Sequence, residues 1–334
     1  MRLMLLPLMG PLHLRYPSYN AVSVRDLVER FAPEAVAVTA LAEGELDDPA
    51  WQSTPEVALP LAVVPWARRR GLPLHTVLEP SPDPDAGRDF QRYLGQYPQG
   101  RVLLAEVEAA LRPLAPLLEE PLDLPRLESE VLPLLHGAQT LRERLFEEGP
   151  GTDWLRARAR VMAARVLALD AARVAVLAGA EHLPLLREAL ADRAELVPAP
   201  EAPPSEAARL RALLDFAFRG EAPEPGKLIA SLRALTEPEA RYHEANLLLA
   251  HGHAAEALDA LEKASHGDFS EPYFLPGYLL ARLGQLRDMA GERDAARRAY
   301  RAVRALSWAP REALEAAAAG LAAAFEGADA ANAS

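Results

Sequence analysis

The chain has 334 residues, half of them apolar, and is long enough for two domains with separate cores. Its formal charge of −12 argues against nucleic acid or an anionic membrane as the main partner, because both require a concentrated basic surface. The lack of cysteine excludes disulfides, thiolate catalysis and iron–sulfur clusters built from this chain, so any metal site has to use His, Asp and Glu.

The first 200 residues alternate short apolar runs with helical patterns. The run at 2–9 predicts a buried strand rather than a secretory signal, because no small-residue cleavage site follows it. Further runs lie at 35–41, 72–78 and 172–182. Continuous apolar strands separated by amphipathic helices are typical of a mostly parallel sheet with helices on both faces, so residues 1–197 are predicted to form an α/β domain. No stretch reaches the roughly 18 apolar residues of a membrane helix, and we expect a cytoplasmic protein without a membrane span.

A helical insertion is predicted inside this domain. Residues 79–89 are rich in proline and aspartate and predict a loop. Apolar residues then recur at helical spacing over about 102–146. After the last strand and helix of the α/β pattern, the proline-rich segment 198–207 predicts an extended linker and marks the expected domain boundary.

The region 208–325 contains no strand-like run and predicts an all-α domain. Two segments within it align on Gly252 and Gly291, which lie 39 residues apart. The second copy carries a leucine–glycine pair and a tyrosine at offsets that resemble the tetratricopeptide repeat. This resemblance implies helical hairpins that bind a protein or peptide partner. The last residues, 326–334, are predicted to be disordered.

Two glycine-x-x-histidine motifs follow buried strands: Gly10 with His13, and Gly179 with His182. Ligands of doubly wound sheets bind outside the carboxyl ends of the strands, so the two imidazoles would face one crevice if their strands are neighbours. Two facing neutral imidazoles are half of a metal site. The alternative is a pair of histidines that cap a helix or form hydrogen bonds at a strand end. His75 ends a third strand-like run and is a weaker candidate.

The first domain resembles the TraB/Tiki group of the erythromycin-esterase and ChaN-like superfamily. The resemblance rests on GPLHLRYPSYNAVSVRDLVERFAPEAVAV at 10–38, RARVMAARV at 158–166 and VAVLAGAEHLPLLREAL at 174–190. It implies that His13 and His182 bind a divalent metal such as zinc, manganese or cobalt, with Gly10 and Gly179 beside the bound group. In the Tiki branch this site is associated with proteolysis. Arg158, at the arginine position of the family, would bind an anion or a carboxylate.

The chain departs from the family pattern at the end of the second strand, where Thr39 replaces the usual acidic residue, and at Ala159, which follows the arginine. A hydrolytic metal site needs a carboxylate as ligand or general base. Glu43, Glu45 or Glu181 would have to supply it. Two functions stay open: a metal-dependent hydrolase of peptidase or esterase type with a helical domain for partner binding, or a catalytically degenerate scaffold that works through its helical repeats.

Overall fold

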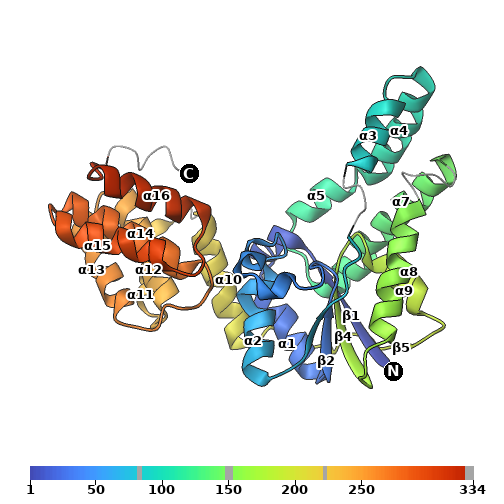
Figure 1. Ribbon diagram of the computed structural model, residues 1–334, viewed down its shortest axis with the longest axis horizontal. Coiled ribbons are helices and arrows are strands. Elements are labelled where there is room, and N and C mark those ends of the chain that lie inside the picture. Colours follow the sequence, from blue (N-terminus) through green and yellow to red (C-terminus); the bar gives the residue numbers. More distant parts are fainter. Residues whose placement is uncertain (81–84, 147–152, 221–223, 328–334) are drawn as a thin grey trace. The chain divides into compact units, whose positions relative to one another are not determined.

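The computed structural model describes residues 1–80, 85–146, 153–220 and 224–327. The chain divides into two units, Met1–Ala212 and Leu213–Ser334, and each is described by itself (Figure 1). The division falls inside helix α10 (Glu206–Arg219), a few residues beyond the linker predicted at 198–207. Most of the tail predicted at 326–334, and residues 81–84 of the predicted loop, lie outside the described residues.

Unit 1 contains a five-stranded sheet in which all the neighbouring strands are parallel. The strands lie in the order β3 (Leu74–Thr76), β2 (Ala35–Val38), β4 (Arg173–Gly179), β1 (Arg2–Leu8) and β5 (Glu195–Leu196). A parallel sheet with many helices agrees with the predicted α/β class. In the register of β1 and β4, Leu8 lies opposite Gly179. The two glycine-x-x-histidine motifs therefore follow neighbouring strands at one edge of the sheet.

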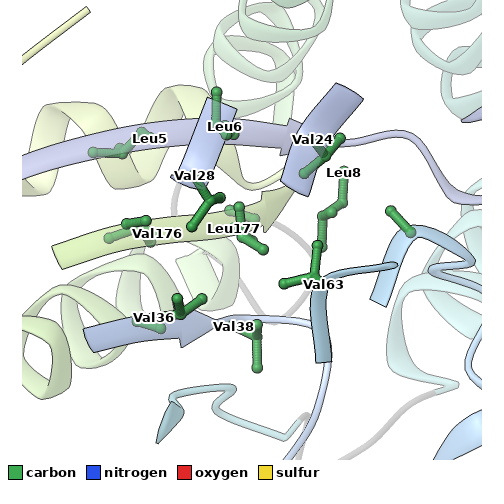
Figure 2. Packing of buried hydrophobic residues seen from close by; sticks show 14 of the residues in the cluster. Leu5, Leu6, Leu8, Val24, Val28, Val36, Val38, Val63, Val176 and Leu177 are labelled. Atoms are coloured by element: carbon green, nitrogen blue, oxygen red, sulfur yellow. The ribbon is translucent and has the colours of Figure 1, made fainter. Parts of the chain in front are cut away.

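The core of unit 1 forms around β1, β2 and β4. Nearly all side chains of these strands are buried, whichever face of the sheet they point to. Figure 2 shows part of this core, in which side chains of the strands and of nearby helices belong to one hydrophobic cluster: Leu5, Leu6, Leu8, Val36, Val38, Val176 and Leu177 from the strands, and Val24, Val28 and Val63 from the helices. Val24 and Val28 belong to α1 (Ala21–Phe31), which begins where the Asn20 side chain accepts a hydrogen bond of 3.0 Å from Ser23 N. This packing fixes the strand ends that carry the candidate site.

Besides α1, several helices of different lengths connect the strands of unit 1. They are η1 (Gly10–Leu14), η2 (Glu45–Asp47), η3 (Pro49–Ser53), η4 (Leu59–Val63), α2 (Val64–Arg70), α8 (Asp153–Leu167) and α9 (Leu183–Leu190). The insertion comprises α3 (Ala86–Leu94), α4 (Pro98–Leu111), α5 (Leu114–Glu119), α6 (Leu124–Arg126), η5 (Leu127–Val131) and α7 (Leu132–Phe146). It starts earlier than predicted, because α3 occupies part of the expected loop. The rings of Phe90 in α3 and Phe146 in α7 meet edge to face at 5.5 Å and stabilise this helix.

The proline-rich segment 198–205 has no regular secondary structure, yet both of its ends are anchored in unit 1. At its start, Val197 N donates a hydrogen bond of 2.8 Å to the Leu3 carbonyl. At its end, the Ser205 hydroxyl donates one of 2.5 Å to Asp26. Both anchors tie the segment to unit 1, whereas the composition predicts a free linker between domains.

Unit 2 is helical in its described part. After α10 it contains α11 (Pro225–Arg233), α12 (Pro238–Ala250), α13 (Ala254–Ser265), α14 (Leu275–Met289), α15 (Arg293–Ala305) and α16 (Arg311–Ala322). Helix α12 packs on α13, and α14 packs on α15. Gly252 and Gly291, the residues matched in the sequence, lie in the turns of these two pairs with φ of 83° and 77°. A left-handed conformation favours glycine and ends the first helix of each pair. None of the described helices combines the length and apolar composition needed to cross a bilayer.

Tyr300 of α15 is fully buried between two glycines. A Cβ atom at Gly284 would lie 2.4 Å from its Cε1, and one at Gly320 would lie 2.2 Å from its Cζ. The ring is held in place because its hydroxyl donates a hydrogen bond of 3.0 Å to the buried Asp288 carboxylate. We expect Gly320→Ala to destabilise unit 2 by about 2 kcal/mol, since a well-packed core does not accept an added methyl group without strain.

Thermal unfolding followed by circular dichroism measures this effect. Gly226→Ala is the matched control, because Gly226 lies in α11 of the same unit and a Cβ there meets nothing within 4 Å. This control should be neutral or slightly stabilising, as alanine favours helix over glycine. Equal unfolding temperatures for Gly320→Ala and the parent would show that the Tyr300 ring can move aside.

Candidate functional site

His13 is fully buried in η1, the turn that follows β1. Its Nε2 accepts a hydrogen bond of 3.0 Å from Met9 N, and its Nδ1 lies 2.8 Å from the Tyr19 carbonyl. These partners assign the neutral tautomer with the proton on Nδ1, which donates to Tyr19. Burial lowers the pKa of His13 to about 4, although the bond to Tyr19 raises it somewhat. Both ring nitrogens are therefore occupied by the main chain.

The second motif is more accessible. His182 stands at the N-terminus of α9 with its side chain 13% exposed, and its Nε2 lies 3.4 Å from Oε1 of the exposed Glu181. Burial lowers the pKa of His182; Glu181 opposes this shift and Arg158 adds to it. The imidazole is therefore neutral at neutral pH and can accept a proton from a bound molecule.

The surroundings of the two histidines bear on the predicted metal site. Within the described ranges, no three His, Asp or Glu side chains lie together as a metal would require. A metal at His13 would also have to displace Met9 or Tyr19 from the ring. Glu43 lies exposed in the loop after β2, and Glu45 accepts a hydrogen bond of 2.5 Å from Ala42 N in the same loop. The metal-binding role of His13 and His182 stays a prediction.

Glu56 is a residue of this site that the sequence analysis missed. Its Oε2 accepts a hydrogen bond of 2.8 Å from Gly10 N, so it joins the first glycine-x-x-histidine motif. Gly10 has a φ of 56°, which favours glycine at the position that holds this carboxyl group. Burial raises the pKa of Glu56 to about 7, the Gly10 amide lowers it, and the charge of Glu181 raises it. Glu56 therefore exchanges a proton near neutral pH.

Arg158 of α8 approaches the same group of side chains. Its guanidinium lies over the Trp154 ring, 4.7 Å from the centroid, and its buried Nε has no hydrogen-bond partner among the described residues. Burial lowers the pKa of Arg158, while Glu181 and Glu79 oppose this shift. The side chain stays charged at neutral pH because an arginine starts from a pKa above about 12. It keeps hydrogen-bonding capacity for an anionic group.

Three further residues considered in the sequence, Gly179, Thr39 and His75, lie at or near the ends of strands. Gly179 makes room for a carboxylate, since a Cβ there would lie 2.7 Å from Oε1 of Glu181. Thr39 donates its amide to the Leu177 carbonyl at 3.0 Å, and its buried hydroxyl has no partner in the part of the chain that the structure describes. His75 lies within β3 rather than beyond its end. Thr39 therefore keeps the strand pairing intact but adds no charge at the end of β2.

Glu181 is the common neighbour of the site, because its charge acts on Glu56, Arg158 and His182. The structure thus joins three of the predicted residues, Glu181, His182 and Arg158, with the unpredicted Glu56. Comparison with known proteins finds no family model, no curated protein and no solved structure that matches this chain. The resemblance to the TraB/Tiki group stays a prediction, and the chemistry of these side chains has to indicate the function.

Proposed function

We propose that unit 1 is a hydrolase of ester or amide bonds whose site comprises Glu56, Glu181, His182 and Arg158. The observation that supports this most strongly is Glu56, a largely buried carboxyl group held by the Gly10 amide with a pKa of about 7. A general acid or base works best when its pKa lies near the working pH. Burial and a neighbouring charge are the usual means of raising a carboxyl group to that range.

Hydrolysis requires a group that takes a proton from the attacking water and a group that gives one to the leaving group. In this proposal ionised Glu56 accepts the proton of the water and, once protonated, returns it to the leaving group. Burial and, to a smaller extent, the charge of Glu181 keep the pKa of Glu56 high, and neutral His182, whose Nε2 lies 3.4 Å from Glu181, can exchange a proton. Arg158 binds an anionic group of the substrate or the oxyanion that forms during attack.

Unit 2, in this proposal, binds a protein or peptide partner through its helix pairs, as the tetratricopeptide resemblance implies. A group of aromatic side chains supports this role: Phe218, Tyr242, Tyr273, Phe274, Tyr278 and Trp308 contact one another across α10, α12, α14 and the segment before α16. Phe218 is 43% exposed and gives the group an accessible edge. Aromatic residues are enriched where proteins recognise partners.

A catalytically inactive scaffold is the second candidate. Thr39, which carries no charge where the TraB/Tiki group usually has an acidic residue, favours it. A scaffold would keep the fold of unit 1 and its buried hydrogen bonds without turning over any substrate.

A substrate screen separates these functions. The purified protein is incubated with chromogenic esters and peptide amides from pH 5 to pH 9, with EDTA or with added zinc, manganese or cobalt. We expect hydrolysis that resists EDTA, changes with pH around 7 and falls about 100-fold in kcat/KM in Glu56→Gln, as loss of a general base predicts. Glu119→Gln, a substitution of an exposed glutamate of the same unit, is the matched control and should keep the parent rate.

Other results would change the assignment. Hydrolysis that is unchanged in Glu56→Gln would refute the acid–base role of this residue. Activity that requires added metal and disappears in His182→Ala would indicate the metal-dependent hydrolase instead. No turnover of any substrate, together with retained partner binding, would favour the scaffold.

A further inference from the structure

A cavity of about 720 Å³ lies in unit 1 between α1, the segment 123–128 and the anchored proline-rich segment 198–205. None of Glu56, Glu181, His182 or Arg158 lines it. Its volume is in the range of pockets that bind small molecules, about 300 to 1,000 Å³.

Hydrogen-bond acceptors dominate the walls. Four of the eight residues from 198 to 205 are prolines, which have a carbonyl oxygen but no N–H. Three of the four side-chain hydroxyl groups at the cavity are already engaged inside the protein, and the fourth, that of Ser18, is exposed. Tyr19 donates to the Pro7 carbonyl at 3.0 Å, Ser23 to Asn20 at 3.2 Å, and Ser205 to Asp26 as described above.

The charged residues of the wall are mostly acidic. Four carboxylates line the cavity, namely Asp26, Asp123, Glu128 and Glu201, against Arg30 alone. Asp26 and Glu128 also bind Arg25 and Arg187, each at 2.5 Å. Even with these two arginines counted beside Arg30, the four carboxylates outnumber the three guanidinium groups, so a bound cation meets a net negative wall.

The acidic groups are spread along the cavity. Among the described residues, no three acidic or histidine side chains come together closely enough for one metal ion. Between the carboxylates lie apolar surfaces, formed by Leu27, Leu124 and the proline rings. Dispersed acceptors separated by apolar surface match a ligand whose charges are dispersed on an aliphatic chain.

We propose that this cavity binds an organic polycation of the polyamine class. Ammonium groups of the ligand would donate hydrogen bonds to the carboxylates and proline-segment carbonyls, and its methylene groups would contact Leu27, Leu124 and the proline rings. The wall supplies acceptors and negative charge, while the ligand supplies donors and positive charge. This inference shares no residue with the proposed hydrolase site and does not depend on it.

Titration calorimetry of the full chain with spermidine, at 150 mM salt, tests the inference. We expect binding at one site per chain and an affinity at least about tenfold weaker in the double variant Asp123→Asn/Glu201→Gln, the loss expected for removing charged hydrogen bonds. Asparagine can still cap the helix that Asp123 begins, where the Asp123 side chain accepts a hydrogen bond from Arg126 N. Glu119→Gln/Asp192→Asn removes the same charge from exposed positions outside the cavity and should leave the affinity unchanged.

A second variant leaves the net charge of the protein unchanged and fills part of the cavity. Ser18 is exposed and lines the cavity, so Ser18→Trp should reduce spermidine binding without changing the net charge or the circular dichroism spectrum. Equal affinity in the cavity and control double variants would overturn the proposal, because it would show attraction to an acidic surface in general. Magnesium that competes with spermidine at equal concentration would overturn it in the same way, as would the absence of binding at 150 mM salt.

Discussion

Replacing His13 by alanine is expected to lower the free energy of unfolding of unit 1 by about 3 to 5 kcal/mol. The substitution removes the partner of two buried main-chain groups, Met9 N–H and the Tyr19 carbonyl. An unsatisfied buried polar group costs about 1 to 3 kcal/mol, and the lost ring adds a cavity. Urea unfolding followed by tryptophan fluorescence reports mainly on unit 1, which holds three of the four tryptophans, Trp51, Trp66 and Trp154.

His75→Ala is the control for this experiment, because His75 is a partly buried histidine of the same unit. Its loss should be clearly smaller. If His13→Ala instead unfolds like the parent and loses a bound metal, the ligand role implied by the TraB/Tiki resemblance would be restored. A large loss of stability in His13→Ala would show that the histidine of the first motif has a structural role rather than a catalytic or metal-binding one.

Glu56→Gln is expected to stabilise unit 1 above pH 7 by up to about 3 kcal/mol. The pKa of Glu56 is raised from 4.5 to about 7 in the folded protein, so the folded state holds this proton more tightly than the unfolded state. Protonated Glu56 therefore contributes to the free energy of unfolding. This contribution is fully present below about pH 4.5 and is lost as the pH rises through 7. Glutamine resembles the protonated form at every pH and does not lose it. Urea unfolding at pH 5 and pH 8 measures the difference.

His13 contributes the opposite slope. Its pKa of about 4 lies below the ordinary 6.5, so its stabilisation is present above pH 6.5 and is lost as the pH falls through 4. Between about pH 4.5 and 6.5 the two contributions oppose each other in the parent protein. Glu56→Gln removes one of them, and its stability should fall more steeply with acid than that of the parent. Parallel profiles for Glu56→Gln, the control Glu119→Gln and the parent would contradict the raised pKa of Glu56.

The main strands could be predicted because strands buried on both faces have continuous apolar sequences. β1 and β4 are such runs, and each is buried on both faces. β5 could not be found, since its two residues, Glu195 and Leu196, are exposed and pair only with the start of β1. Helix α3 was missed because prolines and aspartates precede it, and a tertiary contact between Phe90 and Phe146 stabilises it.

The site could be predicted only in part. Gly10 and Gly179 mark the correct edge of the sheet, because the strands before them are neighbours. His13 forms its hydrogen bonds with main-chain atoms. Every residue has such atoms, so the sequence does not indicate which of them a side chain will contact. Glu56 lies 46 residues from the Gly10 amide that holds it, in a loop without periodicity, so its position emerges only when the chain is folded.

The anchoring of residues 198–205 at both ends changes what a difference in their length would do. In a free tether, added or lost residues alter the reach between domains and leave each domain as it was. Here Val197 and Ser205 are both fastened to unit 1, so the span that the segment has to cover is fixed. Inserted residues would have to bulge away from α1. A deletion would break one of the two anchoring hydrogen bonds or displace the residues that form them. Natural variation in the length of this segment would therefore reshape a cavity wall.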